Sequence, residues 1–422
     1  MSTRGLHSGA DVLGHPRGLS VLFLTETWEK FSYYGMRAIL IYYMTLTLLL
    51  PQAQASVIYG YYTAAAYVTP VVGGWVADRW LGRRAAVLTG GAIMAIGHFM
   101  MASEALFFPA LAAIAFGNGL FLPNLPAQIS GLYAQDDPRR MAAYNVYYAG
   151  INLGAFLAPL VCGALGERLG WHWGFGAAGA GMVVALAIYV AGARWLPADR
   201  PQARTPTDRK AAAGSRAPLF FLGAVIAAVV VFRAAYEQIG NTVAVFTQAG
   251  IDRRLADGLD IPMAWFQALN PLLVFVLTPF LAVAWKAPAA VSGSVRRMAL
   301  GAAVVGLSYL LLALVGGSPE GPAHWSWLVG FFLLITLGEL LILPIGLGVF
   351  GRLSPAHQAG AMIAAWFFAS AAGNLLAGQL GAVWSRTTPA TFFILTAGVA
   401  ASAGALLALI ALRAPRPDGA AA

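Results

Sequence analysis

The stretch ETWEKFSYYGMR (26–37) lies between the apolar runs LSVLFL and AILIYYM. It places four ionisable side chains in the middle of a hydrophobic segment: Glu26, Glu29, Lys30 and Arg37. On a helix, which advances by about 100° per residue, these four and Tyr33 share one stripe roughly 100° wide. A charged stripe on an apolar helix must face protein or water rather than lipid. The stretch therefore predicts a transmembrane helix with one face towards a polar interior.

The composition indicates a membrane protein. Of the 422 residues, 59% are hydrophobic and only 10% are charged, whereas soluble domains carry about 25% charged residues. We therefore expect an all-α, multi-pass protein of the lipid bilayer. The net charge of +9 reflects topology and not a nucleic-acid partner, because arginine and lysine gather in the loops of one side. Under the positive-inside rule this asymmetry places both termini in the cytoplasm.

Apolar runs long enough to span a bilayer, about 20 residues, recur twelve times between charged or turn-rich breaks. They cover residues 19–50, 56–78, 85–103, 105–134, 141–165, 172–196, 218–249, 261–285, 296–316, 325–351, 357–382 and 389–412. The polar, basic, proline-containing stretch 197–217 is expected to be a cytoplasmic linker. It would join two pseudo-symmetric six-helix bundles, residues 19–196 and 218–413, and cytoplasmic tails would lie at 1–18 and 414–422.

Several kinds of site are not indicated. Residues 1–17 lack the basic-then-apolar order of a signal peptide. Cys162 is the one cysteine, which allows no intrachain disulfide. No two histidines have metal-ligand spacing, and no phosphate-binding loop or nucleophile elbow is present. We therefore expect no metal and no organic cofactor.

Further carboxylates interrupt later apolar runs. Glu237 lies in VVVFRAAYEQIGN, one turn after Arg233, and Glu339 lies in FFLLITLGELLIL. Carboxylates in a low-dielectric interior can take up protons near neutral pH, so Glu26, Glu29 and Glu237 could couple proton movement to another process. The alternative is that the charged groups form buried ion pairs that hold helices together, although desolvation offsets much of that attraction.

Neutral polar residues and one charged loop add weaker candidates. Asn152, Asn270 and Asn374 each lie in an apolar run, where a helix–helix hydrogen bond is the alternative to substrate contact, and Tyr67 and Trp366 could equally be core residues. The loop GGWVADRWLGRRAAV (73–87) joins the second and third runs at the cytoplasmic face. Its charged residues could latch helices together in one transport state: Asp78, Arg79, Arg83 and Arg84.

At these residues the chain resembles the proton-dependent oligopeptide transporter family of the major facilitator superfamily, as an atypical bacterial member. ETWEKFSYYGMRAIL resembles the family's ExxER-F-x-YYG signature, and GGWVADRWLGRRA resembles its version of the facilitator loop motif. FGNGLFLPNLPAQISGLY and YYAGINLGAFLAPLVCGALGERLGWHWGFGAAGAGM resemble its long central signature. AAYEQIGN, AWFQALNPLL, GELLILPIGL and AAWFFASAAGNLLAGQL resemble its later helices. The resemblance extends nearly end to end and implies a major facilitator fold with 12 transmembrane helices.

The resemblance also implies roles for single residues. Arg37 would bind the peptide carboxylate, and Glu237 would exchange between a proton and a salt bridge with Arg37. The proton-coupling role of the first-helix motif would fall to Glu26, Glu29 and Lys30. The ammonium end of the peptide would be met by Glu339, Asn152 and Asn270. Side-chain pockets would be lined by Tyr33, Tyr34, Tyr67, Trp366 and Ser370.

Three departures from the family pattern stand out. Leu122 occupies the position before Pro-Asn where the family usually has lysine, so the substrate carboxylate would lose one cation and Glu339 its usual partner. Lys30 replaces the usual arginine and lacks its bidentate fork. The linker 197–217 has no apolar run that could form the two extra helices of many bacterial members.

The sequence thus predicts an inner-membrane, monomeric, proton-coupled symporter for di- and tripeptides that works by alternating access. One alternative keeps the fold but changes the cargo to modified peptides, amine-bearing small molecules or peptide-like metabolites. A membrane-embedded enzyme that uses glutamate and lysine as acid and base is disfavoured. No nucleophile–base pair or metal set accompanies the carboxylates.

Overall fold

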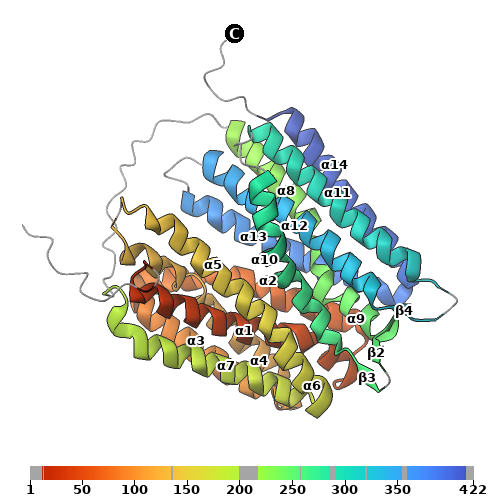
Figure 1. Cartoon of the computed structure of the whole chain (residues 1–422), viewed down its shortest axis with the longest axis horizontal. Helices are drawn as coiled ribbons and strands as arrows, with labels where there is room; N and C mark the ends of the chain where they lie inside the picture. Colours follow the sequence, from red (N-terminus) through yellow and green to blue (C-terminus); the bar gives the residue numbers. More distant parts are fainter. Residues whose placement is uncertain are drawn as a thin grey trace, which may run out of the picture. The chain divides into compact units, whose positions relative to one another are not determined.

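The computed structural model describes residues 12, 14–134, 136–198, 217–256, 258–284, 290–318, 321–353 and 359–414. In this part of the chain the backbone is almost entirely helical (Figure 1). The chain divides into two compact units, each with its own apolar core. Unit one comprises Met1–Ile39 and Val68–Ala203, and unit two comprises Leu40–Tyr67 and Arg204–Ala422. Two helices contribute residues to both units: α1 (Arg17–Leu46) and α2 (Gln52–Val76).

Unit one is built around α3, which packs along both α4 and α7. Its remaining helices are α3 (Arg83–Met100), α4 (Phe107–Phe121), α5 (Arg139–Ala158), α6 (Ala164–Leu169) and α7 (Trp171–Gly192). Helix α4 ends at Phe121, just before Leu122 and Pro123, because a proline has no backbone N–H with which to continue the helical hydrogen bonds. A 3-10 segment, Pro126–Leu132, then leads towards α5. A single π-helical turn, Pro159–Gly163, joins α5 to α6.

Glycines set the helix spacing inside unit one. A Cβ atom at Gly73 of α2 would collide with the backbone carbonyl of Gly119 in α4. A Cβ atom at Gly90 of α3 would lie 2.5 Å from the carbonyl oxygen of Gly117, and the reverse substitution gives the same distance. Small residues allow helix backbones to approach closely where no hydrophobic driving force separates protein from lipid. The packing of α4 against its neighbours therefore depends on these positions.

Unit two is built around α11, which packs along α12 and α14, while α8 packs along α13 and α14. Its helices are α8 (Ala217–Tyr236), α9 (Thr242–Ala249), α10 (Leu269–Ala284), α11 (Val291–Val315), α12 (Ser326–Leu353), α13 (Ala359–Gly381) and α14 (Pro389–Leu412). A 3-10 turn, Glu237–Gly240, interrupts the helical path between α8 and α9.

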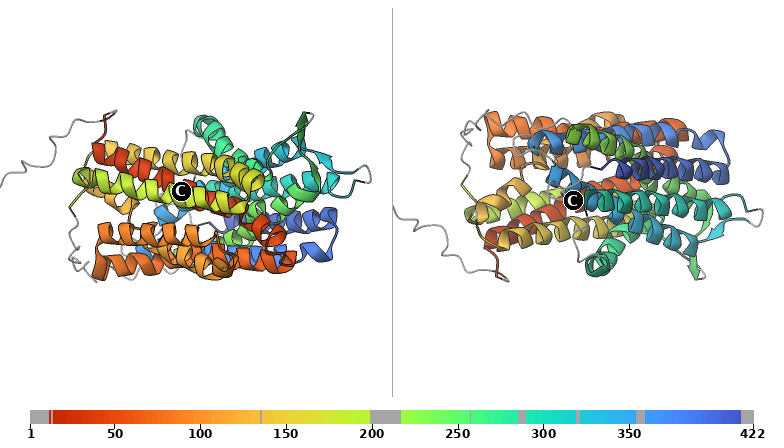
Figure 2. Two further views of the ribbon diagram at one scale, coloured as in Figure 1. Left: turned by 90° about the horizontal axis from the view of Figure 1, so that it is seen from below. Right: turned by 90° about the horizontal axis from the view of Figure 1, so that it is seen from above.

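Two small sheets complete unit two. Strand β1 (Ile251–Asp252) pairs in parallel with β4 (Ala323–His324), and β2 (Arg254–Ala256) pairs antiparallel with β3 (Leu259–Asp260). Figures 1 and 2 show these strands together at one end of the unit's helices, next to α9. Because β1 lies in the segment before α10 and β4 in the segment before α12, the β1–β4 pair links two connections that are far apart in sequence.

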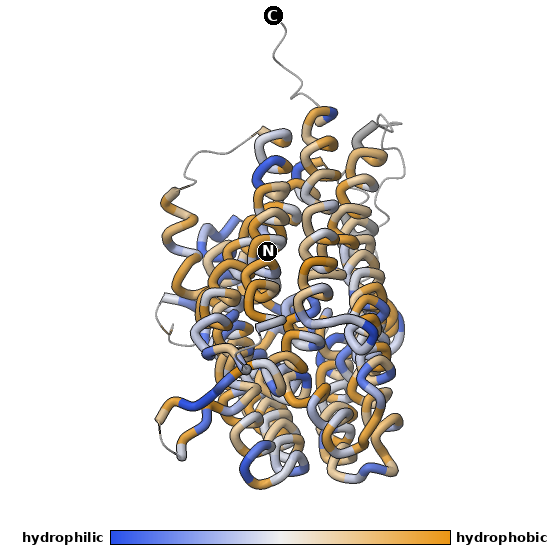
Figure 3. The backbone as a smooth tube through the Cα atoms, turned by 90° about the vertical axis from the view of Figure 1, so that its right-hand side faces the viewer, coloured by the Kyte–Doolittle hydropathy of each residue, from blue (hydrophilic) through white to orange (hydrophobic). Residues whose placement is uncertain are grey.

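The helices agree with the predicted spans: each of the twelve predicted ranges contains a helix. Among the described residues, eight helical segments are long and apolar enough to cross a membrane. Helix α1 is not one of them, because it carries five charged side chains: Arg17, Glu26, Glu29, Lys30 and Arg37. Figure 3 shows hydrophobic residues along most of the helices, and many apolar side chains on helix surfaces are exposed, such as Phe116 and Leu409.

The predicted domain boundaries stay predictions. Residues 199–216 of the predicted linker, residues 415–422 of the C-terminal tail and most of the N-terminal tail lie outside the described residues. The division into compact units groups residues 40–67 with unit two, whereas the sequence pattern places them in the first bundle.

The close glycine packing makes a first prediction. Gly73→Ala places a methyl group against the backbone of Gly119, which cannot move as the end of a flexible side chain can. Overpacking of this kind costs about 1–3 kcal/mol. Gly176→Ala in α7 is the matched control, because a Cβ atom there meets nothing within 4 Å. We expect a lower melting temperature of the purified protein for Gly73→Ala alone; equal melting temperatures in the two variants would contradict the packing argument.

Candidate functional site

The polar face of α1 forms a buried cluster of one base and two acids. The Lys30 Nζ atom lies 2.7 Å from Glu29 Oε2 and 3.4 Å from Glu26 Oε1. Both glutamates are fully buried, and Lys30 is 7% exposed. If all three groups are ionised, the cluster carries one uncompensated negative charge, which is costly away from water. A single proton bound to either carboxylate would remove this excess.

Helix α5 lies directly against this cluster because of two glycines. A Cβ atom at Gly154 would lie 2.9 Å from Lys30 Cβ, and one at Gly150 would lie 3.0 Å from the Thr27 hydroxyl. The motif GINLG thus brings α5 into close contact with the charged part of α1. Asn152, from the same motif, is buried and donates a 3.0 Å hydrogen bond from Nδ2 to the Tyr148 carbonyl of its own helix.

The rest of the first-helix motif continues along α1. Tyr33 is buried and Tyr34 partly buried, and their rings pack edge to face with centroids 5.3 Å apart. The Lys30 ammonium lies over the Tyr33 ring, 6.0 Å from its centroid. Arg37 is partly buried one turn further on. The structure therefore places the motif on a single helix in the order that the sequence predicts.

In unit two, Glu339 and Asn270 meet across two helices. Asn270 Nδ2, on α10, donates to Glu339 Oε2 on α12 at 2.7 Å and to Thr336 Oγ1 at 3.0 Å. The amide orients the carboxylate, and an ionised carboxylate can accept hydrogen bonds at both oxygens. This arrangement can hold a cationic group such as an ammonium. Sequence reasoning named Glu339 and Asn270 but did not foresee Thr336, which has no charge to mark it.

A second acid in unit two has an arginine partner. Arg233 Nη1 lies 2.7 Å from Glu237 Oε1, a pair spaced i,i+4 where α8 passes into its 3-10 turn. The Arg233 guanidinium also lies over the ring of Tyr67 from α2, 5.2 Å from the centroid, and donates to the Tyr67 hydroxyl at 3.5 Å. The four-residue spacing is the sequence signal for this pair, although Arg233 was not among the predicted site residues.

Two predicted pocket residues on α13 are buried in unit two. Trp366 packs edge to face on Phe350, with ring centroids 5.2 Å apart. The Ser370 hydroxyl donates to the Trp366 carbonyl at 3.0 Å, and Asn374 Nδ2 donates to the Ser370 carbonyl at 2.8 Å. These donors are therefore satisfied within the helix. The role of Trp366 and Ser370 in side-chain pockets stays a prediction.

The four predicted latch residues divide into two pairs. Arg83 Nη1 donates to the Ala127 carbonyl at 3.2 Å, and Arg84 Nη2 donates to the carbonyls of Ala193 and Leu196 at 3.0 and 2.7 Å. These bonds tie the start of α3 to the segments that follow α4 and α7, all within unit one. Asp78 and Arg79 have exposed side chains in a π-helical turn, Ala77–Leu81. A latch role in one transport state stays a prediction.

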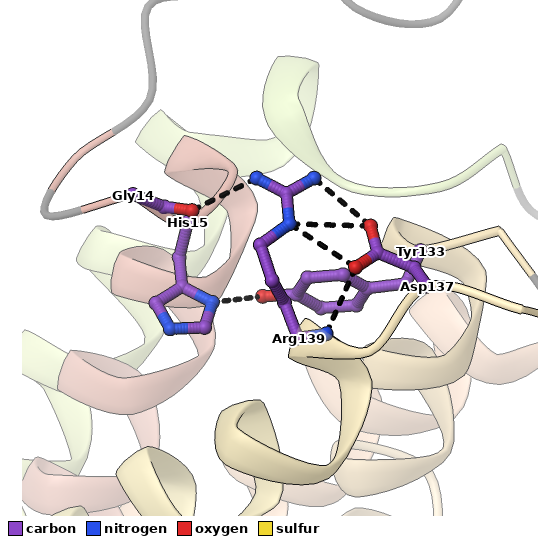
Figure 4. Close-up of polar contacts among 5 residues, drawn as sticks. All are labelled: Gly14, His15, Tyr133, Asp137 and Arg139. Carbon is purple, nitrogen blue, oxygen red and sulfur yellow. Dashed lines mark hydrogen bonds and ion pairs between the residues drawn. The ribbon is translucent and has the colours of Figure 1, made fainter.

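The N-terminal end of α1 is tied to the turn before α5 by a cluster that sequence reasoning missed (Figure 4). The Arg139 guanidinium bonds Asp137 through Nη2–Oδ2 at 2.9 Å and Nε–Oδ1 at 3.1 Å, and its Nη1 donates to the Gly14 carbonyl at 2.8 Å. His15 Nδ1 lies 2.8 Å from the Tyr133 hydroxyl. The spacing Asp-Pro-Arg is a local turn signal, but the partners Gly14 and His15 are more than a hundred residues away.

The described residues hold no group of three histidine, cysteine or carboxylate side chains placed to bind a metal ion. The chemistry that the described side chains offer is that of ion pairs, hydrogen bonds and proton uptake. An all-helical, multi-pass membrane protein with buried acids and bases on its helices is typical of a transporter.

Comparisons with known proteins define the class further. The POT family matches this chain over residues 84–217 and 216–395. The di-/tripeptide transporter of Lactococcus lactis subsp. cremoris is 32% identical to this chain in an alignment 473 positions long, gaps included, that covers 94% of this chain and 95% of that protein. The structure resembles a mutant of peptide transporter POT in complex with alafosfalin, with a TM-score of 0.86 at 32% identity and 96% of each chain covered. It also resembles a POT family transporter in complex with 5-aminolevulinic acid, with a TM-score of 0.85 at 25% identity, covering 95% of this chain and 97% of that one.

The protein is a transporter of the major facilitator fold and not an enzyme. It belongs to the POT family, the family of proton-dependent oligopeptide transporters. The resemblance stated from the sequence motifs is therefore confirmed.

The Asp137–Arg139 pair makes a prediction about pH. Hydrogen bonds from the Arg139 side chain, and then from its backbone N–H, hold the pKa of the Asp137 carboxyl below its ordinary value. The pair therefore stabilises the fold above about pH 4, the ordinary aspartate range, and this contribution is lost as the pH falls further. We expect Asp137→Asn to lower the melting temperature of the purified protein near pH 7, with a difference that shrinks towards pH 3. Asp136→Asn, at an exposed neighbour, is the control; an equal loss in both variants, or one independent of pH, would contradict the assignment.

Proposed function

We propose that this protein is a proton-coupled symporter that imports di- and tripeptides across a bacterial inner membrane by alternating access, with both termini in the cytoplasm. Family membership and the name of the Lactococcus lactis relative support the peptide cargo. The observation that carries the coupling is the buried cluster in which Lys30 faces two carboxylates, Glu26 and Glu29. Its spare negative charge gives an imported proton a place to bind.

Peptide recognition follows from the chemistry of a zwitterion. A peptide has a carboxylate at one end and an ammonium at the other, so its carrier needs a cation and an anion. We assign the carboxylate to Arg37. The ammonium goes to Glu339 with Asn270 and Asn152, supported by the 2.7 Å bond that orients the Glu339 carboxylate. Side-chain pockets are assigned to Tyr33, Tyr34, Tyr67, Trp366 and Ser370.

The carboxylate end of this transporter is unusual. Leu122, a partly buried residue directly after α4, is an apolar side chain where the family pattern has lysine. Leucine supplies no charge to a peptide carboxylate, so Arg37 must supply more of the attraction.

A second candidate cargo follows from the same residue. With one cation fewer, the protein could carry modified peptides or amine-bearing small molecules. Two similar structures support this alternative, one in complex with alafosfalin and one with 5-aminolevulinic acid. The ammonium side of the site, Glu339 with Asn270, would serve either cargo.

The direct test is uptake of labelled dialanine into proteoliposomes under an inward proton gradient. We expect uptake that the gradient stimulates and a protonophore abolishes, because proton entry drives peptide entry. Absence of gradient-stimulated uptake across a broad dipeptide panel would refute the proposal.

Variants at the carboxylate end sharpen the test. Arg37→Ala should reduce dialanine uptake at least tenfold, since about 1.4 kcal/mol of lost attraction is already a factor of ten. Leu122→Lys adds a cation and should raise the affinity for dialanine but not for its C-terminal amide. Substantial uptake by Arg37→Ala would mean that the carboxylate is held elsewhere. Equal competition by dialanine and its amide in the wild-type protein would favour the second cargo.

A further inference from the structure

Arg233 is a buried cation of unit two that contacts two partners. It is 6% exposed and its partner Glu237 is 3% exposed. One partner is the Glu237 carboxylate, whose Oε1 lies 2.7 Å from Arg233 Nη1. The other is Tyr67, whose hydroxyl lies 3.5 Å from the same nitrogen and whose ring centroid lies 5.2 Å from Cζ.

The neighbouring helix leaves room for this side chain. A Cβ atom at Gly373 of α13 would collide with Arg233 Cβ and lie 3.4 Å from its Cδ. The guanidinium also has an unused donor, because Arg233 Nε has no hydrogen-bond partner among the described residues. A buried arginine with an unused donor and a second partner can lose its first partner without leaving the protein interior.

Other titratable groups also face the pair. Tyr236 lies on the same helix, Tyr309 of α11 donates to the Ala235 carbonyl at 2.6 Å, and Glu339 of α12 interacts electrostatically with both members of the pair. Of the two acids Glu237 and Glu339, Arg233 contacts Glu237 directly. Removing one charge of a buried pair leaves the other charge uncompensated, which is strongly destabilising, so loss of the Glu237 charge favours a different arrangement of Arg233.

We propose that Arg233 is a positioning residue for proton coupling, which releases Glu237 and keeps its contact with Tyr67 when Glu237 takes up a proton. This inference rests on the proposed symport function. One proton from solution binds a Glu237 carboxylate oxygen, and no other group loses one. The freed guanidinium is then held by the face and the hydroxyl of Tyr67, since a cation over an aromatic ring is attracted to its negative face. Release of the proton restores the ion pair.

The pH dependence of uptake tests the two contacts of Arg233, because loss of Arg233 and loss of Tyr67 should change it in opposite directions. Uptake of labelled dialanine at saturating concentration is measured against external pH, and the pH of half-maximal rate is compared between variants. Arg233→Gln removes the cation that competes with the proton, so this midpoint should rise by about 1–3 pH units. Tyr67→Leu removes the partner that holds Arg233 when Glu237 is protonated, so the midpoint should fall. Arg233→Lys should stay near wild type because the positive charge remains.

Several outcomes would overturn the inference. A purely structural Arg233 would lower the rate of Arg233→Gln at every pH without moving the midpoint, and Arg233→Lys would not rescue it. If Arg233→Gln does not fold, Tyr67→Leu still decides, since an unchanged or raised midpoint contradicts the proposed role of Tyr67 in holding Arg233. Tyr67→Phe, which keeps the ring, is the matched control. Failure of the symport proposal is distinguishable, because the wild-type protein would then show no gradient-driven uptake at all.

Discussion

Burial of charge in a medium that solvates it poorly is the constraint on which this structure depends. An isolated ion in the interior costs several kcal/mol even after relaxation, so each ionisable group on these helices needs a partner. Lys30 has two acids on its own helix, and Arg233 has one acid on its own helical path and an aromatic ring on another helix. Glu339 has an amide. The choice of these partners connects the sequence to the packing and to the transport chemistry.

The partners come mostly from nearby in the chain. Both ion pairs on α1 and the pair at the end of α8 join residues one or four positions apart. A pair within one helix survives when helices move, because its members travel together. This is useful in a protein that must alternate between conformations, since interactions between helices are the ones that a change of state breaks. Glycines such as Gly154 and Gly373 then let neighbouring helices close over the charged groups.

The sequence predicted the helices well because apolar runs of membrane length leave few alternatives. The i, i+3, i+4 spacing of Glu26, Glu29 and Lys30 is likewise enough to place them on one helix face. Partners that depend on tertiary packing were not predictable in this way. Thr336 beside Asn270, Tyr67 beside Arg233 and Gly14 beside Arg139 become neighbours only once helices distant in sequence are packed. Roles within the site came from the family resemblance, since spacing alone left buried ion pairs as an alternative.

Charge counting connects each unit to the proposed cargo. In unit one, Lys30 faces two acids, Glu26 and Glu29. In unit two, Arg233 pairs with Glu237, which leaves Glu339 held by a neutral amide. Each of these two clusters, Glu26 and Glu29 with Lys30 and Glu237 and Glu339 with Arg233, therefore has one acid more than it has bases. A carrier that binds protons and an ammonium group needs this surplus, because its ligands supply the missing positive charges. A protein that used the same residues only to hold its helices together would gain from equal numbers of each sign.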